Sequence, residues 1–443
     1  MDKHPHFTIG ELCNIEKGVT GIASAIPGAY PLVNTSADRK SCNTFQFDTE
    51  AVCIPLVSST GHGKKSLNYI HYQKGKFALG TILAAVIPKE PKKLSAAFLH
   101  RYLQFNKDRI IVPLMKGAAN VSLAVKDIAK ILIPVPPINE QSSFIELFNK
   151  LNYSSIMLRN EFSTQSSILT KLRQSILQEA IEGKLTAEWR KYNPVKKGDP
   201  DYDAIALLEK IKAEKQKMIA ERMMKKEKLL TQTKLEEVPF ELPNGWVWCR
   251  LGAFTQIKGG KRVSNGYKLL KTPTPFIYIR VTDMKNGTID DTDIHYIDET
   301  MHNKIKQYII TKEDLYMTIV GATIGKCGIV PEKFDKMNLT ENAARIILHQ
   351  VNKEYLIKCL TSQFCQLQFI DKTKQVAVQK MALNRFETSL IPLPPLAEQH
   401  AIVSRVETLL AMVDELEKQV GGQKKQAEEL MQTVLREAFE GGR

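Results

Sequence analysis

Residues 133–141 read Ile-Pro-Val-Pro-Pro-Ile-Asn-Glu-Gln, and residues 391–399 read Ile-Pro-Leu-Pro-Pro-Leu-Ala-Glu-Gln. The two stretches lie 258 residues apart, and the same offset relates Leu172–Gly183 to Leu430–Gly441. Aligned without a gap, residues 133–183 and 391–441 share 16 identities over 51 positions. Two segments of equal length with matching ends indicate an internal duplication.

Each proline-rich motif leads into a long segment whose apolar residues alternate spacings of four and three. This 3.5-residue period, sustained over about four to five heptads, is typical of a coiled coil. The Pro pairs stop helix upstream, and Gly183 and Gly441 stand where helices end. We therefore predict two antiparallel helices of roughly 45 residues, about 68 Å long. The predicted seam includes Leu151, Leu158, Gln165, Leu172, Leu409, Leu416, Gln423 and Leu430.

Gln165 and Gln423 occupy the same seam position in the two copies. They are either polar residues tolerated in an imperfect coil or a polar layer that fixes helix register. The pair Gly421-Gly422 weakens the second helix nearby, and the sequence gives no functional reason for it.

The parts outside the helices repeat less clearly, although residues 9–18 resemble residues 251–260. We expect an α+β protein in which two mixed α/β domains are separated by the coiled coil and related by a pseudo-two-fold axis. The expected parts are a first domain (1–138), a first helix (139–183), a linker with a solvated charged helix (184–242), a second domain (243–396) and a second helix (397–443).

The net charge of +14 resides in the two globular segments. Residues 1–140 carry 17 basic and 10 acidic groups, and residues 243–395 carry 21 and 14, a net +7 each. Two separate basic domains are typical of a protein that binds a polyanion at two places. The chain has no long apolar run, no signal peptide and no Cys-x-x-Cys pair among its seven cysteines. We therefore expect a reduced cytoplasmic protein without membrane, disulfide or zinc.

No enzymatic constellation is present in the sequence. Residues 58–66 and 321–327 approach a phosphate-binding loop, but the first lacks a required Gly and the second is one residue short. No Gly-x-Gly-x-x-Gly cofactor motif and no arrangement of nucleophile and base accompany them. We expect both loops to be structural or DNA-facing turns in a binding protein that is not an enzyme and has no metal site.

The repeated I-P-x-P-P-x-x-E-Q motif and the closing Leu-x-Gln…Glu-Gly segments resemble the specificity subunit of type I restriction-modification systems. Residues 242–252, 278–283 and 320–326 are similar to parts of that family's second recognition domain. The resemblance covers essentially the whole chain. It implies two target-recognition domains that each read half of a split, asymmetric target in double-stranded DNA, with a coiled coil that sets the spacer.

The resemblance also implies partners. Two methyltransferase subunits would join each specificity subunit, and an ATP-driven motor-nuclease would be added for restriction. The cofactors S-adenosylmethionine, ATP and Mg would then be bound by these partner subunits, and none by this chain.

Candidate DNA contacts lie in glycine-containing or basic loops, where ordinary solvated surface is an equally good interpretation. Arg, Asn and Gln can read base edges, whereas Lys more often contacts phosphate. The candidates are His62, Lys64, Lys65, Lys258, Lys261, Arg262, Asn265, Arg280, Lys326, Lys372, Lys374, Gln375 and Gln379.

Glu140, Gln141, Glu398 and Gln399 begin the two helices, where we favour capping by Glu over contact with a methyltransferase. Two alternative functions remain open: a helical scaffold that organises partner subunits with incidental DNA contact, and an enzyme with an unrecognised site. The charge of the two globular segments favours DNA recognition over the scaffold.

Overall fold

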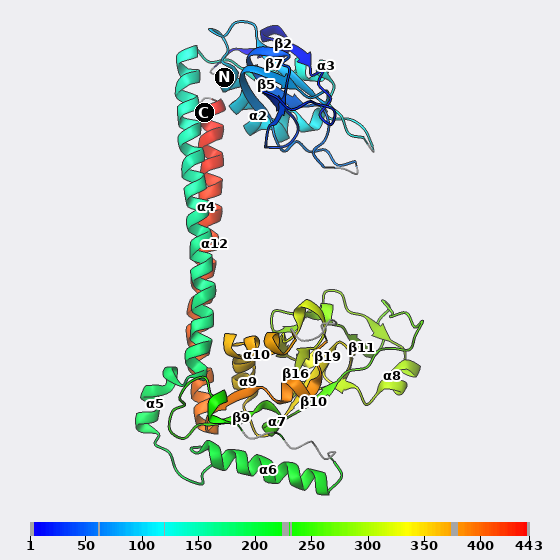
Figure 1. Ribbon diagram of the computed structural model, residues 1–443, viewed down its shortest axis with the longest axis vertical. Helices are drawn as coiled ribbons and strands as arrows, with labels where there is room; N and C mark the ends of the chain where they lie inside the picture. Colours follow the sequence, from blue (N-terminus) through cyan, green and yellow to red (C-terminus); the bar gives the residue numbers. More distant parts are fainter. Residues whose placement is uncertain are drawn as a thin grey trace. The chain divides into compact units, whose positions relative to one another are not determined.

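The structure is a computed structural model that describes residues 4–60, 63–118, 120–223, 230, 233–373 and 380–440. It divides into two compact units, Met1–Thr164 with Val420–Arg443, and Gln165–Gln419. Each unit holds one mixed α/β domain and part of each long helix (Figure 1). The expected fold class of two repeated mixed domains with two long helices is confirmed.

The first domain is built on a six-stranded sheet in the order β2-β7-β5-β6-β3-β4. Helix α2 packs on one face, where its Phe98 joins Val52, Ile54 and Val86 in the core. The strands are β2 (Cys13–Lys17), β3 (Tyr30–Val33), β4 (Lys40–Cys42), β5 (Phe47–Pro55), β6 (His71–Leu79) and β7 (Leu83–Pro88). A smaller pair, β1 (His6–Thr8) and β8 (Leu132–Pro134), accompanies α1 (Ile9–Leu12), α2 (Ala96–Ile110) and α3 (Val125–Ala129).

The second domain has two four-stranded sheets in the orders β10-β19-β16-β17 and β14-β11-β18-β15. The first contains β10 (Thr255–Gly259), β16 (Leu315–Thr318), β17 (Cys327–Ile329) and β19 (Ala343–Leu348), and the second contains β11 (Phe276–Ile279), β14 (Tyr296–Ile297), β15 (Ile309–Ile310) and β18 (Met337–Leu339). Two-stranded pairs are β9 (Val247–Arg250) with β20 (Leu390–Leu393) and β12 (Met284–Lys285) with β13 (Thr288–Ile289). The helices are α7 (Leu251–Phe254), α8 (Glu299–Ile305), α9 (Lys353–Thr361), α10 (Gln363–Thr373) and α11 (Leu383–Glu387).

Strand pairing and glycine packing extend the duplication into both domains. A short parallel pair joins β3 to β6 and, in the second domain, β11 to β18. The strand β2 ends beside Gly18 and the strand β10 beside Gly260, where the backbone approaches a neighbouring loop closely. A Cβ at Gly18 would lie 2.2 Å from the carbonyl oxygen of Gly80, and one at Gly260 would lie 2.2 Å from that of Thr340. The weak similarity of residues 9–18 to 251–260 therefore reflects a shared structural requirement for Gly.

The long helices are α4 (Ile138–Ile181, 44 residues) and α12 (Leu396–Glu440, 45 residues). Helix α4 begins in the first unit and ends in the second, whereas α12 begins in the second and ends in the first. In the first unit, Leu158 and Phe162 share an apolar cleft with Leu430 and Val434. In the second unit, Arg173 of α4 forms ion pairs with Asp414 and Glu417 of α12. Within each unit the two helices therefore pack side by side and antiparallel.

The predicted seam residues differ in burial. Leu151, Gln165 and Leu409 are half-buried, while Gln423 is exposed. Leu158, Leu172, Leu416 and Leu430 are 44%, 40%, 45% and 66% exposed. Two helices without a third neighbour leave the flanks of their shared seam open to solvent, which accounts for partial exposure. The polar-layer interpretation of the two glutamines stays a prediction.

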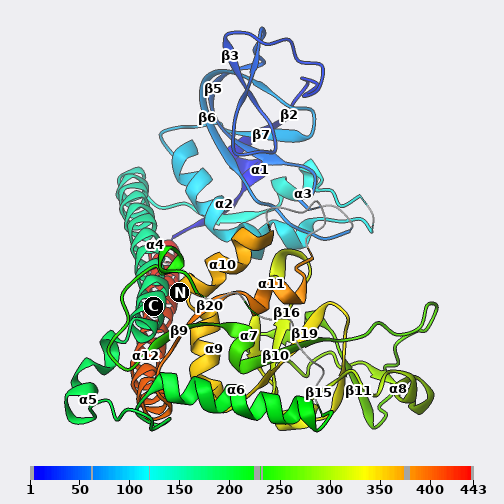
Figure 2. The same ribbon diagram turned by 60° about the horizontal axis from the view of Figure 1, so that its bottom comes forward.

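The linker contains α5 (Ala187–Tyr192) and α6 (Ala204–Ala220) (Figure 2). Helix α6 differs from the solvated helix that we expected, because Leu207 and Ile211 are fully buried. Its Lys215 is also buried, and the ammonium donates to the carbonyl oxygens of Gly252 and Thr255 at 2.8 and 3.2 Å. The apolar positions among its charges are therefore a packing face. None of the described helices is long and apolar enough to cross a membrane.

Candidate nucleic-acid interface

The glutamines of the repeated motif fasten the start of each long helix to its own domain. The Oε1 atom of Gln141 accepts a hydrogen bond from the backbone N–H of Ser95, and that of Gln399 accepts one from Asn352. Ser95 and Asn352 are the N-cap residues of α2 and α9. Both glutamines are fully buried. The motif thus joins a long helix to the helix that packs against the sheet, in the same way in both copies.

The glutamates of the motif differ between the copies, and our preference for helix capping by Glu is not what the hydrogen bonds show. Glu140 is largely exposed and lies 3.7 Å from His4. Glu398 is buried, and its carboxylate accepts hydrogen bonds from Thr186, Arg190 and Trp246 at 2.5–2.7 Å. These three donors come from the linker and from the loop before β9, so Glu398 ties both to the start of α12.

The two phosphate-loop-like segments occupy corresponding places in the two domains. An isolated bridge at Val57 leads into the first loop, and a bridge at Val320 leads into the second. Their partners, Ser122 and Lys380, are again 258 residues apart. Sequence similarity alone did not relate these loops to each other.

Both loops are closed by their own hydrogen bonds. In the first, the backbone N–H of Thr60 donates to Ser66 Oγ and that of Ser66 to Ser58 Oγ. In the second, the backbone N–H groups of Gly325 and Lys326 donate to the carbonyl oxygens of Thr318 and Thr323. Because these amides are engaged internally, they are not open to a phosphate group in the described part of either loop. They present Lys64, Lys65 and Lys326 as exposed side chains, while His62 lies outside the described residues.

The end of β10 and the loop after it present further predicted contacts. Lys258, Lys261 and Asn265 are exposed, and the Lys261 ammonium lies 5.7 Å from the centroid of the Tyr308 ring. Arg262 is also exposed, but its Nε donates to Glu341 at 2.6 Å. A cleft of about 670 Å³ adjoins Lys258 and includes Gly259, Gly260, Tyr308 and Arg345 in its lining.

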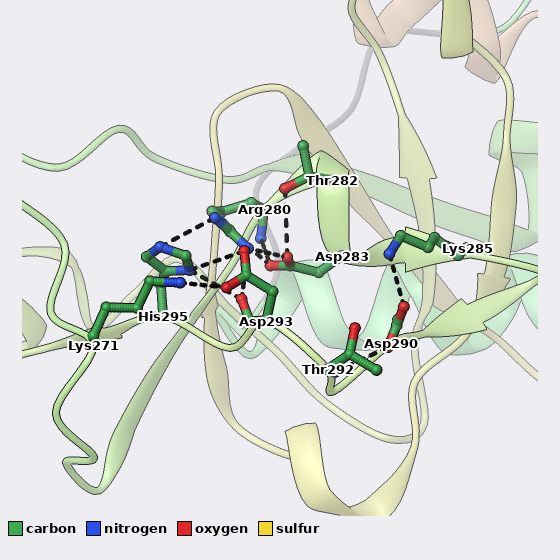
Figure 3. Close-up of polar contacts among 9 residues, drawn as sticks. All are labelled: Lys271, Arg280, Thr282, Asp283, Lys285, Asp290, Thr292, Asp293 and His295. Atoms are coloured by element: carbon green, nitrogen blue, oxygen red, sulfur yellow. Dashed lines mark hydrogen bonds and ion pairs between the residues drawn. The ribbon is translucent and has the colours of Figure 1, made fainter. Parts of the chain in front are cut away.

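Arg280 lies inside an ion-pair network, which Figure 3 shows in detail. Its guanidinium donates to Asp283 on one side and to Asp293 on the other, at 2.5 and 3.1 Å for the closest carboxylate atoms. Lys271 pairs with Asp293 as well, and His295 lies 3.3 Å from Arg280 Nη1. The hydrogen bond to Asp283 is the main cause that raises the pKa of Arg280. Contact of Arg280 with DNA stays a prediction, and in this structure its charge is already balanced.

The last predicted run lies largely outside the described residues. Lys372 belongs to α10, but its side chain is outside them, as are Lys374, Gln375 and Gln379. No group of three or more metal-ligating side chains occurs in the part of the chain that the structure describes.

Sequence reasoning missed a polar cluster in the first domain around Arg39. Its Nε donates to Gln73 Oε1 at 3.2 Å, and its Nη1 lies 3.1 Å from His71 Nδ1. Burial is the main cause that lowers the pKa of His71 to about 4, and the neighbouring charge of Arg39 adds to it. His71 is therefore neutral near pH 7 and offers a lone pair to the guanidinium. No short motif marks these residues, because the fold joins them across 32 and 34 positions of sequence.

The sequence of this chain is similar to that of a known protein family. A family model described as the type I restriction modification DNA specificity domain matches residues 1–165 and 243–423. The specificity subunit of the type I restriction enzyme EcoDI of Escherichia coli is 26% identical over 440 residues, which are 98% of this chain and 87% of that protein. That of EcoBI, also from Escherichia coli, is 27% identical over 321 residues, 72% of this chain. The chain thus spans 60% of the EcoBI subunit's length.

Solved structures share the fold. The HsdS subunit from Thermoanaerobacter tengcongensis matches with a TM-score of 0.52 at 15% identity, over 99% of this chain and 97% of that one. A chain from a solved type I R-M system matches with a TM-score of 0.66 at 14% identity, over the full length of both chains. At these identities the likeness supports the architecture and not the recognised sequence.

Proposed function

Because the chain belongs to the type I restriction-modification DNA specificity family, we propose that it reads a two-part, asymmetric target in double-stranded DNA. Each mixed α/β domain would bind one half of the target. The observation that carries the proposal is the duplicated unit, in which Gln141 and Gln399 make the same bond to a domain while the domains themselves differ. The same bond would attach each domain to its long helix in an equivalent way. Because the two domains differ, the half-sites that they recognise would differ as well.

The charge of the domains supports double-stranded DNA as the partner. Each domain carries a net +7. Exposed lysines in corresponding loops, Lys64 and Lys65 in one and Lys326 in the other, are suited to phosphate contacts. A scaffold with incidental DNA contact has no need for such matched basic loops.

The long helices would set the spacer between the half-sites. Forty-four residues of helix span about 66 Å, which is roughly two turns of duplex. The separation of the half-sites is then fixed by helix length and not by the domains.

Catalysis would belong to partner subunits. We propose that two methyltransferase subunits, which bind S-adenosylmethionine, join this non-catalytic chain, one for each copy of the repeat. A motor-nuclease subunit that uses ATP and Mg would add restriction. The two copies of the domain–helix unit would supply two related docking surfaces, one for each methyltransferase.

Helix length offers a direct test. Three heptads inserted into both helices add 21 residues, or about 32 Å, close to one turn of duplex. The lengthened chain, co-purified with its methyltransferase, should modify genomic DNA at the same two half-sites with a spacer about 10 base pairs longer. Insertion of one or two heptads is the out-of-phase control, because it rotates the half-sites relative to the domains. An unchanged spacer, or a single contiguous motif in the unaltered protein, contradicts the proposal.

A further inference from the structure

We propose that Arg39 reads a guanine in the half-site of the first domain, an inference that rests on the proposed function. Its guanidinium is half-buried, yet no carboxylate among the described residues pairs with it. A half-buried arginine without a carboxylate partner is suited to bind a ligand that supplies hydrogen-bond acceptors.

The fold holds Arg39 in a fixed place. It immediately precedes β4, and its side chain reaches His71 and Gln73, which lie two residues apart on β6 and therefore share one face of the sheet. Their register partners on β5, Cys53 and Ala51, are fully buried. The acceptors that position Arg39 thus lie on β6, an inner strand of the sheet, on the face opposite α2.

The hydrogen-bond partners of Arg39 are neutral. Gln73 and the carbonyl oxygen of Ala37 accept hydrogen bonds, and the neutral ring of His71 offers Nδ1. Arg39 forms no ion pair with any described residue, and its Nη2 makes no hydrogen bond there. Burial consequently lowers the pKa of Arg39, which means that the charged form is held at a cost in free energy. These contacts orient the guanidinium without balancing its charge.

Several other half-buried arginines have partners of a different kind. In the second domain, Arg250 pairs with Glu237, Arg280 with Asp283 and Asp293, and Arg345 with Asp314. In the first domain, Arg101 lies over the Phe148 ring, 5.1 Å from its centroid, and so has an aromatic partner. Arg39 differs from all of these in having only neutral hydrogen-bond acceptors.

Guanine has the chemistry that this guanidinium can recognise. Its O6 and N7 atoms are two acceptors that match the planar guanidinium of an arginine, and this pair is the commonest specific contact between a protein and a base. Exposed Lys64 and Lys65 lie in the loop that leads to β6, and exposed Lys40 follows Arg39 directly. The same domain therefore carries exposed lysines suited to phosphate and one oriented guanidinium suited to a base, which is the division of roles that sequence-specific DNA-binding proteins use.

The test compares Arg39→Lys with Lys40→Ala in the complete complex with the methyltransferase. Each complex modifies genomic DNA from a host without such methylation, and the modified sites are mapped together with the rate at each. Arg39→Lys keeps the positive charge and removes the planar guanidinium. The variant therefore tests base recognition separately from electrostatic attraction to DNA and from folding. We expect this variant to accept other bases at one G·C position of one half-site, with about a tenfold or larger loss of discrimination there. Lys40→Ala should leave the motif unchanged and lower the rate at all sites alike.

The outcomes are distinguishable. If the unaltered complex gives a two-part motif but Arg39→Lys keeps every base of it, the inference about Arg39 is wrong and the proposed function stands. A change at an A·T position, or at both half-sites, also overturns the inference. If the unaltered complex gives no two-part motif, the proposed function itself fails.

Discussion

The Oε1 atom of Gln141 accepts a hydrogen bond from the backbone N–H of Ser95, with a donor–acceptor distance of 2.9 Å. The Nε2 atom of the same side chain donates to the carbonyl oxygens of Lys93 and Pro136, both at 2.8 Å. One buried amide therefore satisfies three backbone groups at the junction of the first domain with its long helix. Gln399 repeats two of these bonds, to Asn352 and Pro394.

Replacement of Gln141 by Leu should destabilise this junction. The apolar side chain leaves one buried N–H and two carbonyl groups without partners, at a cost of about 2 kcal/mol in unfolding free energy. Faster amide hydrogen exchange at the start of α2 would report the loss. Gln423→Leu is the matched control, because Gln423 is exposed on α12, and it should leave exchange at α2 unchanged. Equal protection in both variants would contradict the anchoring role of Gln141.

Glu398 and Glu140 allow a comparison of equivalent positions with different surroundings. Glu398→Leu removes the carboxylate that pairs with Arg190 and leaves the Trp246 indole N–H without its acceptor. We expect a loss of about 3 kcal/mol in the second unit, since the partner charge is only partly exposed. All three tryptophans lie in that unit, so urea unfolding followed by tryptophan fluorescence measures it. Glu140→Leu alters the exposed equivalent in the first unit, which holds no tryptophan, so its unfolding is followed by circular dichroism. This variant should change stability little, and a loss equal to that of Glu398→Leu would refute the assignment.

The stability of the first domain should fall in acid because of His71. Its folded pKa of about 4 lies below the value near 6.5 of an unfolded chain, so the unfolded state takes up the proton first. The contribution is complete above pH 6.5 and is lost progressively toward pH 4, by about 3 kcal/mol in total. Urea unfolding followed by circular dichroism across this range should show the slope.

Two variants separate the contributions of His71 and Arg39 to this pH dependence of stability. His71→Gln should flatten it. Arg39→Gln should weaken it without abolishing it, because burial is a larger cause of the lowered pKa than the charge of Arg39. An identical slope in all three proteins would show that other groups govern the acid response.

The glycine pair Gly421-Gly422 should destabilise α12, although packing does not require glycine at either position. A Cβ at Gly421 or Gly422 would meet no atom within 4 Å, and both residues are helical. Substitution by Ala should therefore stabilise the protein by about 1 kcal/mol for each residue. A higher urea midpoint in Gly421→Ala is expected, whereas Gly18→Ala should lower it, because its Cβ would collide with backbone. A fall in both would mean that Gly421 has a packing role.

The parts that the sequence predicted are those with a repeated or periodic signal. The offset of 258 residues and the 3.5-residue period gave the two long helices and the repeated domains. The sequence could not tell which member of the Glu-Gln pair anchors a helix, since burial of Gln141 depends on Ser95, 46 residues away. It also could not show that Arg280 is neutralised by Asp293, or that no described carboxylate pairs with Arg39, because both depend on contacts between strands and loops.

Exchange of residues 1–138 for the corresponding domain of another specificity subunit tests the central claim most directly. The chimera and the parent chain, each co-purified with the methyltransferase, modify the same genomic DNA, and the methylated motifs are mapped. If each domain reads its own half-site, one half of the motif changes while the other half and the spacer stay the same. A motif that changes in both halves, or that does not change at all, would contradict this account.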